Sequence, residues 1–259
     1  MYTIRYDAPM DWETYNVYPL ADWHIGDENC SHSEIDEQIQ RVLDDPHGLV
    51  ILNGDLLNAA LKNSVSDVYS EKMKPMDQII MLSGLLRPLA DRVIGATTGN
   101  HEARVYRDDG VDIMRIVCRE LGIEDKYHPD GVLIFLRFGA VRSHKSDGLT
   151  RKLFTLYATH GTGGGRKEGA KAIRLADMAA TVDADVYIHS HSHLPMIFPE
   201  NYFRVNVGNS SVMEVEKLFI NTGAKLEYGG YGQRYEFKPN SRRYPVIHLN
   251  ARGIATATL

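Results

Sequence analysis

The sequence predicts an α/β protein in which two packed sheets are flanked by helices. In the first half of the chain, short hydrophobic runs of strand length alternate with stretches of helical periodicity. In the second half, strand-like runs follow one another closely, as in a sheet built from neighbouring strands. The 259 residues suffice for one large domain and are short for two, so we expect a single domain over residues 1–259.

Three strands and three helices are expected in the first half. The strands are expected at 16–21, 49–52 and 92–98, and the helices between Ser31 and Leu43 and at 76–90 and 109–121. Ser31 and Glu34 have the spacing of a capping box, and Ile35 and Ile39 then share one helical face. Pro75 precedes the second helix, where its missing N–H costs no hydrogen bond. Each strand leads into a polar motif.

The second half is expected to be richer in strands. They are expected at 131–141, 152–159, 185–189 and 203–207, with one helix at 169–181. A glycine-rich, basic loop from Gly161 to Gly169 opens that helix. From residue 226 onward the pattern is β-like. We expect residues 212–259 to form a β-rich C-terminal extension, and the pattern leaves open whether it is a cap, an edge hairpin or a dimer contact.

Composition favours an ordinary globular protein. Hydrophobic residues make up 43% of the chain and charged residues 24%, and the net charge of −5 provides no global attraction to nucleic acid or anionic membranes. The two cysteines, Cys30 and Cys118, have no CxxC partner, which favours a reducing compartment. No apolar run approaches the roughly 18–20 residues of a membrane span. We therefore expect a cytoplasmic protein without membrane contacts.

Five short polar motifs each follow a hydrophobic run. They are Asp22-Trp23-His24, Gly54-Asp55, Gly99-Asn100-His101-Glu102, His160-Gly161 and His191-Ser192-His193. Strand ends are where an α/β sheet presents functional groups. Aspartate and asparagine oxygens together with imidazoles form a ligand set for a pair of divalent metals, and paired metals are used to attack phosphate esters. Each motif alone is weak evidence. The chance occurrence of all five motifs in this order is a less economical explanation than one shared site.

The first three motifs each have a chemical rationale and a simpler alternative. Asp22 and His24, at i and i+2, can aim at one point on a strand-end turn, although many such triplets are solvated loops. Asp55 has two oxygens and can bridge two metals, although Gly-Asp is also a common turn. Asn100 offers a neutral oxygen and His101 can donate a proton to a leaving oxygen. The alternative for this third motif is a helix N-cap.

The last two motifs supply imidazoles. A lone histidine such as His160 at a strand end is more often structural than a ligand. In the final motif, His191 and His193 can serve two adjacent metals. His189 precedes them and allows a second H-x-H register, but the strand is expected to include it, which favours His191 and His193.

As a set, the motifs resemble those of the calcineurin-like metallophosphoesterase superfamily, whose pattern is D-x-H, G-D, G-N-H-(E/D), H and G-H-x-H. The resemblance covers about residues 16–211. Ser190 departs from it, because the superfamily has glycine before the H-x-H pair. The resemblance implies a four-layer sandwich, with two central mixed β-sheets and helices outside, and hydrolysis by in-line attack of a hydroxide that bridges two metals.

The resemblance also implies a role for each motif side chain. One metal would be held by Asp22, His24, Asp55 and His193. The other would be held by Asp55, Asn100, His160 and His191, with Asp55 as the bridge. His101 would be a catalytic histidine that is not a ligand. For the two divalent ions we expect manganese, with iron, zinc, magnesium and nickel as alternatives.

The substrate is indicated less directly. The first motif, Asp-Trp-His-Ile-Gly, is similar to the D-W-H-L-G motif of bacterial double-strand-break repair nucleases in this superfamily. This favours a phosphodiester, with DNA or RNA as the candidate partner, and Arg166 and Lys167 of the basic loop as candidate substrate-binding residues. The alternatives are a phosphomonoesterase acting on a phosphoprotein or small ester, and a non-catalytic scaffold that keeps the fold. The oligomeric state is not predicted.

Overall fold

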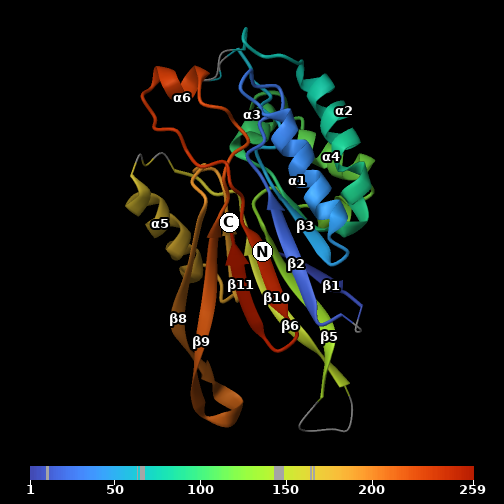
Figure 1. Ribbon diagram of the computed structural model, residues 1–259, viewed down its shortest axis with the longest axis vertical. Helices are drawn as coiled ribbons and strands as arrows, with labels where there is room; N and C mark the ends of the chain where they lie inside the picture. The colour runs from blue at the N-terminus through green and yellow to red at the C-terminus, as the bar shows by residue number, and fades with distance from the viewer. Residues whose placement is uncertain (10–11, 63, 65–67, 143–148, 164, 166) are drawn as a thin grey trace.

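Two mixed β-sheets form the centre of the computed structural model (Figure 1). The structure describes residues 1–9, 12–62, 64, 68–142, 149–163, 165 and 167–259. The six-stranded sheet has the order β1-β5-β6-β7-β9-β8, and the five-stranded sheet has the order β11-β10-β2-β3-β4. In the first, β1 is parallel to β5, and β6, β7 and β9 are mutually parallel neighbours. In the second, β2, β3 and β4 are parallel.

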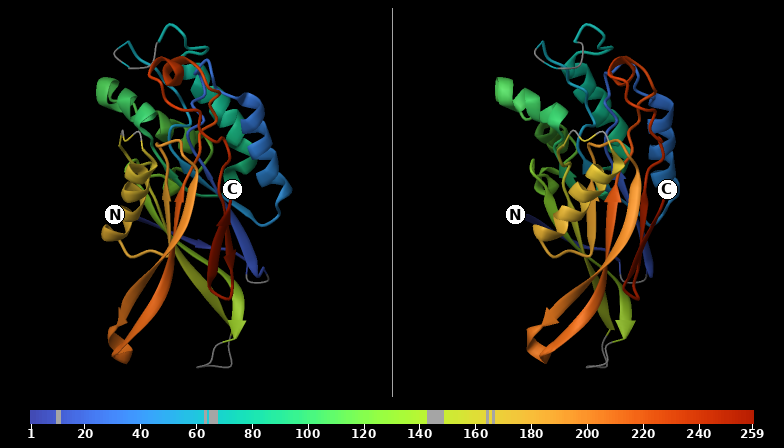
Figure 2. Two further views of the ribbon diagram at one scale, coloured as in Figure 1. Left: turned by 60° about the vertical axis from the view of Figure 1, so that its left-hand side comes forward. Right: turned by 90° about the vertical axis from the view of Figure 1, so that its left-hand side faces the viewer.

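The strands of each sheet come from both halves of the chain. The six-stranded sheet contains β1 (Tyr2–Asp7), β5 (Val132–Arg142), β6 (Leu149–Ala158), β7 (Val186–His189), β8 (Met196–Asn206) and β9 (Ser211–Asn221). The five-stranded sheet contains β2 (Thr14–Leu20), β3 (Gly48–Asn53), β4 (Val93–Thr97), β10 (Val246–Asn250) and β11 (Ile254–Thr258). Figure 2 shows the β8–β9 hairpin extending away from the end of the molecule where α6 lies.

Helices form the two outer layers. They are α1 (His32–Asp44), α2 (Pro75–Leu86), α3 (Asn100–Asp109), α4 (Ile113–Glu120), α5 (Glu168–Ala176) and the short α6 (Gly230–Arg234). Short 3₁₀ turns occur at Arg87–Arg92, Glu124–Lys126, Asp177–Ala180 and Val207–Asn209. Apolar faces of α1, α2 and α4 pack with β2, β3 and β4, whereas α5 packs on β7 and β9. The predicted four-layer sandwich with two central mixed sheets is confirmed.

A continuous apolar core lies between the two sheets. Val17 and Ile51 of the five-stranded sheet pack in one cluster with Ile134, Leu156 and Ile220 of the six-stranded sheet. All five side chains are fully buried. Burial of this kind stabilises by about 25 cal/mol per Å² of apolar surface, so the face-to-face contact fixes how the two sheets sit on each other. This packing holds the strand ends of the two sheets beside each other.

Several elements differ from the expectation. Strand β1 was not expected, because its alternating polar residues and half-exposed edge position leave no hydrophobic run. The helix expected at 109–121 begins at Ile113, since Gly110, with φ of 71°, ends a separate helix that starts at Asn100. The region after residue 226 is β-like only from Val246, because α6 and irregular chain precede it.

Residues 212–259 contribute strands to both sheets, and β10 and β11 form a hairpin at the edge of the five-stranded sheet, which is one of the alternatives that the pattern left open. Strand β9 lies between β7 and β8, and β10 pairs with β2. The outer half of β9 is exposed and the inner half is buried, so its sequence lacks the continuous pattern of an internal strand. Among the described residues, no helix is long and apolar enough to cross a membrane.

Candidate metal centre

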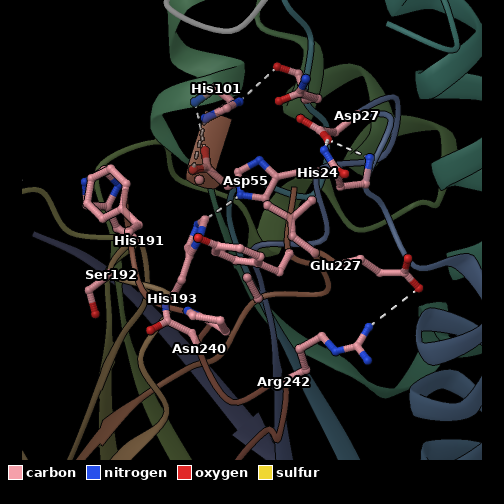
Figure 3. Close-up of a pocket in the computed structure, with 18 of the residues that line it drawn as sticks. His24, Asp27, Asp55, His101, His191, Ser192, His193, Glu227, Asn240 and Arg242 are labelled. Carbon is pink, nitrogen blue, oxygen red and sulfur yellow. Dashed lines mark hydrogen bonds and ion pairs between the residues drawn. The ribbon is translucent and has the colours of Figure 1, made fainter. Parts of the chain in front are cut away.

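The five motifs meet at one place, at the carboxyl ends of parallel strands. Asp22, Asp55 and Asn100 follow β2, β3 and β4 of the five-stranded sheet. His160 and His191 follow β6 and β7 of the other sheet. Because the two sheets pack face to face, these ends converge from both layers (Figure 3). The expectation that strand ends present the functional groups therefore holds for both sheets.

One group of potential ligands consists of Asp22, His24 and His193. The ligand atoms of the three lie within 4.8 Å of one another. The Nε2 atoms of His24 and His193 are 3.1 Å apart, and Nε2 of His193 is 3.4 Å from Oδ1 of Asp22. Thr222 donates a hydrogen bond to the other oxygen of Asp22 at 2.9 Å, which orients the carboxylate.

A second group consists of Asp55, His160 and His191. Nε2 of His160 lies 3.1 Å from Oδ2 of Asp55. The predicted fourth ligand is also present, because Oδ1 of Asn100 is 2.6 Å from Nδ1 of His191. A third group consists of His24, Asp55 and His101, so Asp55 lies between the two sets and His101 is within ligand distance of both residues. All seven predicted ligand positions are thus brought together, and Asp55 has the position expected of a bridge.

The donor set fits divalent metal ions. Two imidazole nitrogens 3.1 Å apart, as in His24 and His193, repel unless a proton or a cation lies between them. Nε2 of His160 is buried and makes no hydrogen bond of regular geometry, although Asp55 is close. Mixed imidazole nitrogen and carboxylate oxygen suits manganese, iron or zinc better than calcium.

Strained backbone marks the same residues. Positive φ angles occur at Asp22 (54°), His24 (51°), Asp55 (49°), His191 (64°) and His193 (54°). The left-handed region is sparsely populated by residues other than glycine, and such a residue costs on the order of 1–3 kcal/mol. Strain of this kind persists where surrounding structure enforces it, and it clusters at functional sites. Five ligands in this conformation therefore support a shared function.

Two motif glycines are required by close approach. A Cβ atom on Gly99 would lie 2.1 Å from Oδ1 of Asp55. Gly54 has a φ of 79°, and a Cβ atom there would lie 2.3 Å from the backbone nitrogen of Gly99. The loops after β3 and β4 therefore touch through glycine, which lets Asp55 and Asn100 approach the same centre.

Glu102 joins these two loops from within. Its carboxylate accepts hydrogen bonds at 3.0 Å from the backbone N–H groups of Asp55, Leu57 and Gly99. Burial and the neighbouring Asp55 charge raise the pKa of Glu102 to about 7. Gly99 caps α3 and Asn100 is its first residue, so the motif does begin a helix, although the asparagine is not the cap. The sequence indicated Glu102 only as a neighbour of a cap.

Replacing Glu102 with alanine is expected to destabilise the protein by about 3 kcal/mol or more, because three buried N–H groups lose their acceptor at about 1–3 kcal/mol each. Urea unfolding of the two proteins measures the difference. Glu102→Gln keeps an acceptor oxygen and serves as the matched variant with a smaller loss. Equal stability of wild type and Glu102→Ala would show that Glu102 does not hold the two loops together.

The histidines are oriented by contacts on their far sides. Nδ1 of His160 donates to the Asn53 carbonyl oxygen at 2.8 Å, which leaves Nε2 toward Asp55. Asn53 also donates through its amide to the Ser190 hydroxyl at 2.6 Å, so the serine that replaces the superfamily glycine holds the histidine loop. Outer contacts of this kind fix the tautomer and direction of metal-binding imidazoles.

His189 does not belong to the centre. Its Nδ1 lies 2.9 Å from Oδ1 of Asn221, and its ring is buried against Gly161. A Cβ atom on Gly161 would lie 1.9 Å from Nε2 of His189. The choice of His191 and His193 over the alternative register is therefore the one that the geometry supports.

His101 lies at the edge of the ligand cluster. Its backbone N–H donates to Oδ1 of Asp55 at 2.8 Å, and its Nε2 is 3.9 Å from Oδ2 of the same residue. Its Nδ1 is 3.0 Å from the Asn58 carbonyl oxygen. Burial lowers the pKa of His101 to about 4, against the opposing effect of Asp55. The side chain faces the cavity in front of the cluster (Figure 3).

Asp55 is a buried carboxylate whose ionisation is set by the neighbouring histidines. Burial acts to raise its pKa, but the nearby His160 and His101 hold the pKa well below the usual range. Burial acts to lower the pKa of His160, and Asp55 overcomes this and raises it to about 10. A buried carboxylate that remains ionised is suited to hold cations.

A cavity of about 930 Å³ opens in front of these residues. Arg104 of α3 and Lys171 of α5 line it from the metal side, and the segment 224–242, which includes α6, forms the opposite wall. Arg242 in that wall pairs with Glu34 at 2.9 Å and lies 3.7 Å from Glu227. The cavity thus combines cations beside the cluster with a wall from the C-terminal part of the chain.

The two predicted substrate-binding residues are Arg166 and Lys167, and neither is found in the cavity lining among the described residues. Arg166 lies outside the described residues. Lys167 is exposed at the N-cap of α5 and does not line the cavity. Arg104 and Lys171 line the cavity, where Arg104 donates to the His101 carbonyl oxygen at 3.1 Å and Lys171 to the Ser192 carbonyl oxygen at 2.8 Å. Lys171 is four residues after Lys167, and Arg104 is three residues after His101. Residues three or four apart share a helix face, so this spacing could have indicated both cations from the sequence.

Comparisons with known proteins find similar structures. Neither a family model nor a curated protein matches the chain. Among solved structures, a predicted phosphoesterase from Streptococcus pneumoniae has 12% identity and a TM-score of 0.38, covering 95% of this chain and 98% of its own. A metallophosphoesterase from Sphaerobacter thermophilus has 11% identity and a TM-score of 0.40, covering 93% and 86%. Zinc-complexed Vps29 from Entamoeba histolytica has 12% identity and a TM-score of 0.37, covering 94% and 97%.

The resemblance to the calcineurin-like phosphoesterases is carried by the five motifs. With identities of 11–12% and TM-scores of 0.37–0.40, these matches say nothing about the metal centre, which depends on the residues and distances described above. The similarity of the first motif to repair nucleases stays a prediction.

Proposed function

We propose that the protein is a dinuclear metal-dependent phosphoesterase that hydrolyses phosphodiester bonds. The observation that carries the proposal is the set of three adjoining Asp/His groups, which are linked through His24 and Asp55. The strained backbone at five of the ligands supports it, because a scaffold without a metal would gain nothing from that strain.

The residues divide into metal ligands and groups that act on the substrate. Asp22, His24 and His193 would hold one ion, Asn100, His160 and His191 the other, and Asp55 both. The ions, for which we propose manganese, would supply Lewis acidity and lower the pKa of water. His101 faces the cavity and is placed to donate to phosphate or the leaving oxygen. Arg104 and Lys171 would neutralise the phosphate charge.

A diester is favoured over a monoester by the size of the site. The cavity of about 930 Å³ is lined both by the cluster and by the 224–242 segment, which is more space than a small monoester requires. Tyr228 in the lining is 53% exposed and offers an aromatic face, as a nucleobase would require. Together with the Asp-Trp-His-Ile-Gly motif, these features support a nuclease-like activity on DNA or RNA.

The proposal is tested with bis-p-nitrophenyl phosphate beside p-nitrophenyl phosphate, each with Mn²⁺ and with a chelator. We expect metal-dependent cleavage that prefers the diester. Preference for the monoester would instead indicate a phosphatase. Bound metal without turnover of either ester, or of DNA and RNA oligonucleotides, would contradict the enzymatic function.

Replacing Lys171 with methionine is expected to lower kcat/KM for the diester by about 10-fold, because a charged hydrogen bond is worth about 1.5–3 kcal/mol. Lys167→Met is the matched control, since Lys167 caps the same helix but is outside the cavity lining. Steady-state kinetics of both variants make the comparison. An equal loss in the two would show that the effect is one of general charge.

A further inference from the structure

A buried polar network lies behind His101, away from the metal ligands. It consists of Asn58, Glu71 and Gln78, of which Asn58 and Gln78 are buried and Glu71 is half-buried. Among the described residues that line the cavity, Asn58 is present, whereas Glu71 and Gln78 are not. Buried polar side chains with a complete set of partners order the structure around them, so their relation to His101 is informative.

The direction of the His101 ring depends on one backbone carbonyl. Nδ1 of His101 is 3.0 Å from the Asn58 carbonyl oxygen. A carbonyl oxygen can only accept, so Nδ1 must carry the proton in this contact. The ring is then fixed with Nε2 toward Asp55, 3.9 Å away (Figure 3). Any rotation of the peptide after Asn58 would remove this anchor.

That peptide is held in a strained position. Ala59 has a φ of 44°, in the left-handed region that alanine rarely adopts. Its N–H donates to Oε1 of Gln78 at 2.8 Å. The Asn58 side-chain amide donates to Oε1 of Glu71, and its backbone N–H donates to the Ile25 carbonyl at 2.9 Å. Without the contacts to Gln78 and Glu71, the strain at Ala59 would favour rotation of the peptide.

Glu71 and Gln78 are also complementary to each other. Nε2 of Gln78 donates to Oε2 of Glu71 at 2.5 Å and to the Met73 carbonyl at 2.9 Å. Gly26 leaves the space for this amide, since a Cβ atom there would lie 2.2 Å from Nε2 of Gln78. Glu71 therefore supplies two acceptor oxygens, whereas Gln78 supplies one acceptor oxygen and one donor amide.

We propose that Glu71 and Gln78 are positioning residues for His101. They hold the Asn58–Ala59 peptide so that its carbonyl anchors the ring, and they touch neither the ligand cluster nor the cavity. The inference rests on the proposed function of His101 as the group that acts on the substrate.

A donor–acceptor swap tests the pair. Glu71→Gln has one acceptor oxygen for the two amides of Asn58 and Gln78, so one of those contacts is lost. Gln78→Glu places two carboxylates together and removes the donor to the Met73 carbonyl. The double variant Glu71→Gln/Gln78→Glu restores the contact between the two side chains with the roles exchanged and keeps acceptors for Asn58 and Ala59, and only the donor to Met73 stays missing. Asp77→Asn is the matched control, since Asp77 precedes Gln78 on α2 but is exposed.

For the manganese-loaded protein acting on bis-p-nitrophenyl phosphate, each single variant is expected to lower kcat by about 10–100-fold, the usual cost of an outer-shell contact. KM and manganese content should stay near wild type, and the double variant should recover part of kcat. Wild-type kcat in both single variants, or no recovery in the double variant, would overturn the inference.

A second readout does not depend on turnover. In zinc-loaded, ¹⁵N-histidine-labelled protein, His101 should show an Nδ1-protonated ring in the wild type and in the double variant. The single variants should lose that signature, with His101→Ala identifying the signal. An unchanged His101 signal in the single variants would overturn the inference even if no ester is cleaved, whereas absence of cleavage with the expected signals would count against the proposed function alone.

Discussion

Replacing Asp55 with alanine is expected to abolish the binding of both metal ions and nearly all hydrolysis. Asp55 belongs to two ligand groups, is buried, and has its pKa held well below the usual range by His160 and His101. Its removal leaves both ions without the shared carboxylate. The loss should exceed the roughly 10–100-fold that is typical of outer-shell substitutions.

Metal content measured by mass spectrometry, together with kcat for the diester, provides the test. Asp27→Ala is the matched control, because Asp27 also lines the cavity but belongs to none of the ligand groups among the described residues. It should keep its metal. Retention of both ions by Asp55→Ala would contradict the bridging role, and loss of only one would show that the second group is complete without Asp55.

Replacing His101 with alanine is expected to leave the metal content near wild type and to lower kcat by about 10²–10⁴-fold, as for a group that transfers a proton. The structure makes this a sharp test, because His101 lies within ligand distance of His24 and Asp55. His32→Ala, an exposed histidine on α1, is the control. Loss of metal from His101→Ala would show that His101 is a ligand.

The site was predictable because strand order makes it local. Each motif follows directly from a hydrophobic run, and parallel strands bring their carboxyl ends together without information from distant residues. Asp22, Asp55 and His160 could therefore be placed at one centre from the sequence. The left-handed backbone of Asp22 and Asp55 could not be predicted, since it results from close contacts between loops of different strands.

What the sequence did not show depends on contacts between distant segments. The wall formed by 224–242 reaches the cavity because β9 and β10 belong to different sheets, so the chain between them crosses the end of the molecule. Glu102 and Gln78 act on backbone groups 19 or more residues away. Hydrogen bonds of this kind have no periodic signal. Strand β1 was not predicted for a different reason, since a half-exposed edge strand carries polar residues on its open face.

Manganese binding followed by electron paramagnetic resonance tests the central claim most directly. Mn²⁺ is added stepwise to metal-free protein. We predict that two ions bind per chain and give the spin-coupled spectrum of a pair joined by a shared ligand, as expected for two ions roughly 3.5–4 Å apart. A single uncoupled ion, or no binding by the full chain, would contradict a dinuclear centre bridged by Asp55.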